Sequence, residues 1–191
     1  MFRSGYELTT GLTNLLISFS SLYCFVKLKN INYNKYWLLF YIFLMLGGFL
    51  GFVIHSFNIN DLIVNILWII LLFIFICIID SLLFTEYKFN KYIVICSILL
   101  YLFMIVEVIL NKDFIITFVI YVCTNLLFII ISFIRNKKYY YLSALLFQVI
   151  GGLILINRNT KMFYLDHNGI YHLFMMFTVI GFYVGNKKYM K

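Results

Sequence analysis

Polar and apolar positions divide the chain into seven long apolar stretches that are separated by short polar connections. A helix needs about 20 predominantly apolar residues to cross a bilayer, and each stretch is close to this length. The apolar runs are continuous and lack the alternation of a half-buried strand, so they predict helices rather than a membrane barrel. The expected spanning segments are 7–27, 37–57, 62–84, 91–110, 114–134, 140–156 and 169–185.

The composition agrees with a membrane protein of one domain. Apolar residues make up 64% of the chain and charged residues 12%, which is more apolar surface than a soluble core of this size can bury. The connections are too short to form another domain, so we expect residues 1–191 to form a single all-α transmembrane domain. The first segment follows one basic residue and contains Asn14, which predicts that it is retained rather than cleaved as a signal peptide.

The net charge of +8 lies in the connections and predicts the orientation in the membrane. Basic residues concentrate on the cytoplasmic side of membrane proteins, which here places the N-terminus outside and the C-terminus in the cytoplasm. Because these residues do not interleave along one face, we do not expect a nucleic-acid partner. The predicted cytoplasmic side has Lys27, Lys29, Lys35, Lys88, Lys91, Arg135, Lys137, Lys138, Lys187, Lys188 and Lys191, and the other side has Arg3, Lys112, Arg158 and Lys161.

All three histidines are expected at the non-cytoplasmic end. His167 and His172 lie at the start of the last segment, and His55 lies near the end of the second. Glu7 and Asp61 begin the first and third segments at the same end. A catalytic zinc keeps three protein ligands and an activated water, so the histidines could bind zinc. Asp61 or Glu7 could then accept a proton or orient a ligand.

The spacing of the last two histidines restricts this hypothesis. Residues five apart on a regular helix point about 140° apart. His167 and His172 can therefore share a site only if the last segment begins near Gly169 and His167 folds back from the connection. The alternative is that His55 and His172 are interfacial residues that behave like aromatic side chains, and that His167 is an exposed loop residue.

Other polar and small residues predict helix packing. Gly47, Gly48 and Gly51 in the second segment are expected to let another helix approach closely. A polar stripe along the first segment is expected to face other helices or a cavity, since lipid would penalise it. The stripe consists of Glu7, Thr10, Asn14, Ser18 and Ser21.

The remaining acidic and sulfur-containing residues have less defined roles. Asp80 is expected to be neutral, paired across helices with a residue such as Gln148, or exposed to water. Glu107 is expected to reach headgroup water. The four cysteines lack CxxC spacing and are interpreted as small buried apolar residues rather than disulfides or ligands. They are Cys24, Cys77, Cys96 and Cys123.

The string from Leu165 to His172 resembles the Asp, His and aromatic-His motif of the CREST superfamily. These seven-helix membrane proteins include alkaline ceramidases, progestin/adiponectin receptors and GPI-lipid remodelling proteins. The string is also similar to a His-Asn-Asp-x-Tyr-His signature of uncharacterised bacterial relatives. The resemblance covers the whole chain coarsely and implies that His55 and His172 are zinc ligands.

The chain departs from the pattern of that superfamily at two positions. Asn168 stands where the first histidine of helix 7 is expected, with His167 displaced by one residue as the third candidate ligand. Gly51 stands where a serine of helix 2 is expected. The aspartate expected early in helix 3 corresponds to Asp61, with Asn65 as the weaker match.

These observations predict a membrane-embedded, zinc-dependent hydrolase of a lipid amide or ester, with its site in the non-cytoplasmic half of the bilayer. Asp61 and Glu7 are the candidate catalytic residues, and membrane lipids are the expected partners. The alternatives are a non-catalytic binding or sensor protein of the same fold, and a small transporter, which the glycine pairs in segments two and six suggest. We expect the bacterial plasma membrane, with the endoplasmic reticulum as the alternative. The sequence defines neither the ligand nor the oligomeric state.

Overall fold

The computed structural model describes residues 5–29, 34–87, 89–110, 115–157 and 159–189. Seven helices in this part of the chain are long and apolar enough to cross a membrane, which confirms the predicted all-helical, multi-pass class. The predicted start of the fifth segment, Phe114, lies outside the described residues. The helices are α1 (Tyr6–Lys29), α2 (Lys35–Ser56), α3 (Asp61–Glu86), α4 (Lys91–Ile109), α5 (Ile115–Arg135), α6 (Tyr139–Ile156) and α7 (His167–Tyr189).

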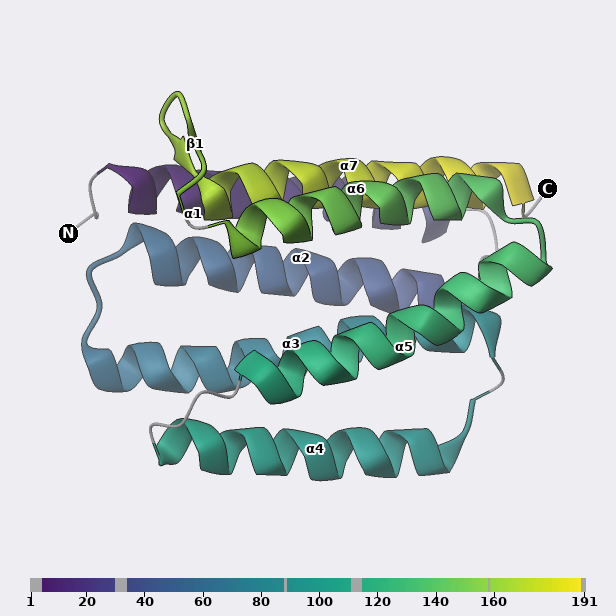
Figure 1. Cartoon of the computed structure of the whole chain (residues 1–191), viewed down its shortest axis with the longest axis horizontal. Coiled ribbons are helices and arrows are strands. Elements are labelled where there is room, and N and C mark those ends of the chain that lie inside the picture. Colours follow the sequence, from purple (N-terminus) through teal and green to yellow (C-terminus); the bar gives the residue numbers. More distant parts are fainter. Residues whose placement is uncertain (1–4, 30–33, 88, 111–114, 158, 190–191) are drawn as a thin grey trace.

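Six of the helices form a closed ring, and α4 lies outside it. α1 packs on α2, α2 on α3, α3 on α5, α5 on α6, α6 on α7, and α7 on α1 again. α4 packs mainly on α3 and forms one edge of the bundle (Figure 1). Only Ser97 and Met104 of α4 are fully buried, and about half of that helix is exposed on the lipid-facing side. The ring is the scaffold that encloses the candidate site.

Glycines of α2 allow the backbone of α1 to approach closely, as the sequence predicts. A Cβ atom on Gly48 would lie 2.7 Å from the carbonyl oxygen of Asn14 and 2.9 Å from the backbone nitrogen of Ser18. A Cβ atom on Gly51 would lie 2.8 Å from the side-chain oxygen of Asn14. The buried polar stripe of α1, which includes Thr10 and Ser21, therefore lies against neighbouring helices.

Asparagine side chains begin three of the helices. Each occupies the N-cap position and accepts a hydrogen bond from a backbone N–H in the first turn, which replaces a bond that the helix itself cannot supply. The pairs are Asn34 with Tyr36, Asn60 with Leu62, and Asn90 with Tyr92.

A tight turn between α5 and α6 is connected to α3 by an ion pair. Lys137 adopts a left-handed conformation with φ of 54°, and the N–H of Lys138 donates to the carbonyl of Phe133. These bonds end α5 in a Schellman motif. The Lys138 ammonium then lies 2.6 Å from the buried carboxylate of Glu86 at the end of α3.

α7 extends to Tyr189 rather than ending near Gly185, because Asn186 is part of the core. Asn186 is fully buried, accepts a hydrogen bond from the hydroxyl of Tyr141, and donates one to the hydroxyl of Tyr41. Trp37 and Phe182 pack beside these tyrosines. The aromatic core therefore occupies the end of the bundle opposite the histidines.

Several expectations for individual residues require correction. Asp80 is paired across helices, which was one of the expected alternatives, but its carboxylate accepts hydrogen bonds from Tyr121 and Ser97 instead of Gln148. Glu107 is not simply exposed to headgroup water, since it accepts a hydrogen bond from Thr117 and one of its carboxylate oxygens is buried. All four cysteines are free; Cys24 is buried and Cys77 is partly buried, whereas Cys96 and Cys123 are exposed on the lipid-facing surface.

The connection between α6 and α7, expected to be only a loop, contains a small hairpin. Strand β1 (Lys161–Met162) pairs antiparallel with β2 (Leu165–Asp166). The hairpin contacts α1 and α7. A pair of two-residue strands has no hydrophobic periodicity of its own, so the sequence pattern does not indicate it.

The close approach of α1 and α2 can be tested with a matched pair of glycine substitutions. Gly48→Ala should lower the free energy of unfolding by about 1–3 kcal/mol, because the added methyl group collides with backbone atoms of α1. Gly152→Ala in α6, where a Cβ meets no atom within 4 Å, should leave the stability unchanged or raise it by about 0.5–1 kcal/mol. Denaturant unfolding in detergent measures both variants. Equal effects would contradict the close packing of α1 on α2.

Candidate functional site

A cavity of about 480 Å³ lies inside the ring and is lined by residues of all six ring helices. Along α2 it extends from Phe40 to His55, which corresponds to about 22 Å at the rise of an α-helix. Toward the aromatic core its walls are apolar, with Phe40, Leu82 and Phe182 among them. At the other end polar side chains gather, and we call this the polar end: Asn14, His55, Gln148, Asn168, Tyr171 and His172.

The cavity wall is polar at one end but carries no ionic side chain. Among the described residues that line it there is no Asp, Glu, Lys or Arg. Its polar groups are amides, imidazoles and hydroxyls. An ion placed inside would therefore lose its hydration without gaining an opposite charge, which costs several kcal/mol. The cavity suits a neutral molecule with a polar head and an apolar body.

The ring of His172 is oriented by α1. The hydroxyl of Thr13 donates to the carbonyl oxygen of Thr10 at 2.8 Å, so its hydrogen is already used. Its oxygen also lies 3.2 Å from Nδ1 of His172 and can only accept there. A neutral His172 therefore carries its proton on Nδ1 and has its lone pair on Nε2. This tautomer is assigned from the hydrogen-bond network.

His55 is oriented in a similar way by a carboxylate. Its Nδ1 lies 2.9 Å from a carboxylate oxygen of Glu7, which can only accept from an N–H. A neutral His55 therefore also has its lone pair on Nε2. Its ring is nearly perpendicular to that of Trp68 of α3, at 6.3 Å between the ring centres. In these tautomers Nε2 of each histidine is the ring nitrogen that can accept a hydrogen bond from a ligand.

Asp166 connects the polar end to the start of α7. It is the N-cap residue of that helix, because its carboxylate accepts from the backbone N–H of Gly169 at 2.9 Å. The hydroxyl of Thr10 donates to the same oxygen at 2.9 Å. Asn168 donates to the other carboxylate oxygen. These bonds fix the first turn of α7 against α1 and thereby position His172.

The pKa of Asp166 reflects this set of bonds. Partial burial raises the pKa, but hydrogen bonds from Gly169 and Thr10, the neighbouring His167 and the amide of Asn168 outweigh it. The pKa of the folded state therefore lies below the ordinary value of 3.8. The carboxylate form is the one that holds α7 in place.

Three of the predicted site residues do not line the cavity: His167, Asp61 and Glu7, of which Glu7 bonds His55. α7 begins at His167, so this residue occupies the first helical turn instead of folding back from a loop. Its Nδ1 is 4.0 Å from Asp166, and its side chain does not line the cavity. Asp61 is exposed at the start of α3 and is also absent from the cavity wall, as is Asn65.

The described residues contain no group of three or more His, Cys, Asp or Glu side chains placed to hold a metal ion. The predicted set of His55, His172 and His167 reduces to two histidines at one cavity, with Glu7 bonded to one of them. A zinc site with three protein ligands does not fit this arrangement. Zinc chemistry therefore stays a prediction from the resemblance.

Sequence reasoning missed several residues of the polar end. Tyr171 lines the cavity, and its hydroxyl accepts a hydrogen bond from Nε2 of Gln148 at 2.8 Å. Trp68 lies beside His55. Asn168 lines the cavity although it was considered only as a replaced histidine. The sequence could have predicted this grouping from spacing, because positions three and four apart on a helix share a face. Tyr171 and His172 lie three and four residues after Asn168.

The fold and the cavity define a seven-helix membrane protein with an internal site that is apolar along its length and polar at one end. The chain belongs to the family of unknown function DUF6962, whose model matches residues 9–191. No curated protein and no solved structure matches the chain.

Because the carboxylate of Asp166 caps α7, the stability of the folded protein should depend on pH in the acidic range. Because the folded-state pKa lies below 3.8, the stabilisation is fully present above that pH and is lost as the pH falls through the folded value. Asp166→Ala should cost about 0.5–2 kcal/mol near neutral pH through loss of the cap. Asp166→Asn should show a smaller loss of stability on acidification than the natural protein, because an amide does not titrate.

The measurement is the midpoint of thermal unfolding between about pH 7 and about pH 3. Asp61→Asn, which removes an exposed carboxylate at the start of α3, is the control for a general loss of acidic charge. Parallel pH profiles for Asp166→Asn and the natural protein would contradict a stabilising role for the ionised Asp166.

Proposed function

We propose that the protein is a membrane-embedded binding protein for a neutral amphiphile whose polar head carries hydroxyl or amide hydrogens. The observation that carries this proposal is the cavity, which is long, apolar and polar at one end, with no ionic side chain in its described lining. The proposal corresponds to the non-catalytic alternative for the fold.

The polar end indicates the chemistry of the head. Nε2 of His55 and Nε2 of His172 are acceptors, so they call for donors on the ligand. The hydroxyl of Tyr171 already accepts from Gln148 and keeps its own hydrogen for an acceptor on the ligand. A hydroxyl, primary amide or secondary amide supplies donor and acceptor together, whereas an ether or hydrocarbon head would leave these buried groups unsatisfied.

The apolar length of the cavity indicates the chemistry of the body. Each buried methylene contributes about 0.8 kcal/mol. A chain of about ten methylenes would contribute about 8 kcal/mol, against an association cost of about 4–15 kcal/mol. We therefore infer that the chain supplies most of the affinity, while the polar end selects among heads. Alcohols and primary or secondary amides with one long chain are the class that satisfies both.

Zinc-dependent hydrolysis of a lipid amide or ester, which the resemblance to the CREST superfamily implies, is the second candidate. Two observations favour it: His55 and His172 line one cavity, and Glu7 orients one of the rings through Nδ1. Hydrogen bonding of the second ring nitrogen to a carboxylate is typical of zinc-bound histidines. Among the described residues, His55 has such a carboxylate partner, whereas Nδ1 of His172 bonds the hydroxyl of Thr13. The binding proposal needs no third metal ligand.

We also propose that the polar end of the cavity faces the non-cytoplasmic side. The bias of basic residues toward the opposite end supports this orientation, and the α1 N-terminus would then lie outside. Some of the basic residues that enter this argument lie outside the described part of the chain. They are Arg3, Lys88, Lys112, Arg158 and Lys191.

A ligand panel of equal chain length tests the binding function. In protein reconstituted into nanodiscs, a fluorescent neutral amphiphile is displaced by a long-chain alcohol, a primary amide, a carboxylate or a quaternary ammonium. We expect the alcohol and the amide to bind at least about tenfold more tightly than either ion, which corresponds to about 1.4 kcal/mol. Equal or tighter binding of the ions would contradict a neutral site.

Substitutions at the polar end provide the matched variants. His172→Phe keeps the ring volume and removes the acceptor, so the affinity for the amide should fall about tenfold. Thr124→Val on α5 removes an exposed threonine hydroxyl that bonds only its own helix, and it should leave the affinity unchanged. The same preparations are assayed for zinc and for ester hydrolysis. Zinc that is lost in both His55→Ala and His172→Ala, together with turnover, would favour the hydrolase.

Cysteine labelling tests the orientation. Asn58→Cys lies between α2 and α3, and Phe89→Cys lies at the other end of α3. In sealed right-side-out vesicles, a membrane-impermeant maleimide should label Asn58→Cys and should reach Phe89→Cys only after permeabilisation. The reverse pattern would place the polar end in the cytoplasm, while the binding function could still hold.

A further inference from the structure

The turn of the β1–β2 hairpin carries large apolar residues, one of them in a backbone conformation that such residues rarely adopt. Phe163 and Tyr164 connect the two strands, and Phe163 has a φ of 54°. Glycine and asparagine adopt this left-handed conformation most readily, and bulky residues rarely do. The backbone therefore does not explain a phenylalanine at this position, which points to a role for its side chain.

The hairpin is held rigidly against the bundle. The hydroxyl of Thr9 donates to the carbonyl oxygen of Tyr164 at 2.8 Å, so α1 binds the turn itself. Asp166, at the end of β2, caps α7 and accepts from Thr10. The direction of the hairpin is thus defined by α1 and α7.

The tip of the hairpin is exposed and apolar. Phe163 is 86% exposed, Tyr164 82% and Met162 53%. The hairpin projects sideways from the bundle, across the direction of the helices and beside the first turns of α1 and α7 (Figure 1). Because the helices cross the membrane, an element at their ends that points sideways lies along the membrane surface instead of extending into water.

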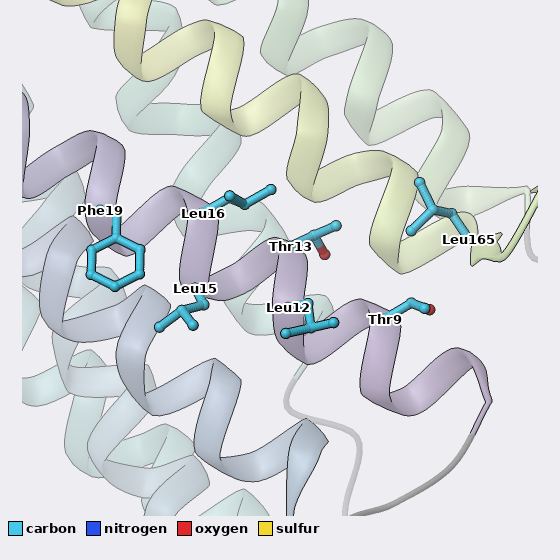
Figure 2. A pocket seen from close by; sticks show the side chains of 7 residues that line it. All are labelled: Thr9, Leu12, Thr13, Leu15, Leu16, Phe19 and Leu165. Atoms are coloured by element: carbon cyan, nitrogen blue, oxygen red, sulfur yellow. The ribbon is translucent and has the colours of Figure 1, made fainter.

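A shallow apolar groove begins under the hairpin. It has a volume of about 310 Å³ and is formed by one face of α1 from Thr9 to Phe19, with Leu165 of β2 at the end nearer Thr9 (Figure 2). At the rise of an α-helix this face is about 15 Å long. The hydroxyls of Thr9 and Thr13 donate to carbonyl oxygens of the protein, which leaves the groove without a free donor from these residues.

We propose that the hairpin is a membrane-interface anchor: Phe163 and Tyr164 lie at the boundary between headgroups and acyl chains, and one acyl chain of a bilayer lipid lies in the groove along α1. Aromatic side chains are favoured at this boundary, where tyrosine can keep its hydroxyl in water. The lipid surface is the partner that is present wherever these helices are inserted. Thr9 and Thr10 bond the hairpin, and Thr13, one turn further along α1, bonds His172. The anchor thus holds the helix that orients the polar end.

Depth-dependent fluorescence quenching tests the anchor. Phe163→Trp places an indole at the tip, in protein reconstituted into phosphatidylcholine vesicles with bromine either near the headgroup or near the end of the acyl chains. The tryptophan emission is measured as the difference from the natural protein, which contains the buried Trp37 and the partly buried Trp68. We expect the added emission to be lost mostly with the shallow bromines, and acrylamide in the water to quench it weakly.

Leu102→Trp, which is 52% exposed near the middle of α4, provides the reference for the bilayer interior and should be quenched more by the deep bromines. Strong quenching of the Phe163→Trp emission by acrylamide, without an effect of either bromolipid, would overturn the anchor and indicate a tip in water. Emission that neither quencher reaches would also overturn it, because protein, such as a second copy of this chain, would then cover the tip. Size-exclusion elution and thermal unfolding matched to the natural protein verify that both variants are folded.

Discussion

The close contact between the backbone of α1 and the glycines of α2 determines where the polar groups of the cavity lie. Gly48 brings α1 so near that a methyl group would collide with the backbone of Asn14 and Ser18. Gly51 then leaves the space that the amide of Asn14 occupies. By the resemblance to the CREST superfamily a serine would stand at Gly51. In this chain the side chain of Asn14 fills that space from the neighbouring helix, and it becomes part of the cavity wall.

α1 organises the polar end through a row of bonds to other helices. Glu7 orients His55 of α2, Thr10 bonds Asp166 before α7, and Thr13 orients His172. Each of these bonds fixes a group whose rotation would otherwise cost entropy when a ligand binds. Because both imidazoles use Nδ1 for the protein, their Nε2 atoms are the acceptors that the proposed ligand would meet. A helix with modest hydrophobicity thus defines the chemistry of the site.

The sequence predicts the helices well because each bilayer crossing leaves a long apolar run. It also predicts that the glycines of α2 let another helix approach closely and that the polar stripe of α1 faces other helices. Both predictions follow from the period of a helix. The placement of His55 and His172 at one end follows from counting the crossings. The partners of Asp80 and Gln148 could not be predicted, because they depend on which helices are neighbours, and α4 lies outside the ring. The hairpin and the start of α7 depend on Asp166 and Thr10, which are distant in sequence and meet only in the folded chain.

The neutrality of the cavity results from where the helices place their acidic side chains. Asp80 bonds hydroxyls of α4 and α5, and so faces the helix that lies outside the ring. Glu86 is buried beside Lys138 at the far end of α3. Glu107 accepts from Thr117 in the pair of α4 and α5. These three carboxylates thus have partners away from the cavity.

Inside a bilayer, a cavity that binds a neutral head needs a wall without unpaired carboxylates. An unpaired carboxylate in the wall would bind a cation or a proton instead. Glu7 bonds a residue of the polar end, and it reaches His55 from the more exposed end of α1. Its charge strengthens the hydrogen bond to Nδ1 and makes Nε2 a better acceptor. The cavity therefore gains basic acceptors from a carboxylate that does not itself line the wall. This is the electrostatic arrangement expected of a site that distinguishes a hydroxyl or amide head from a charged one.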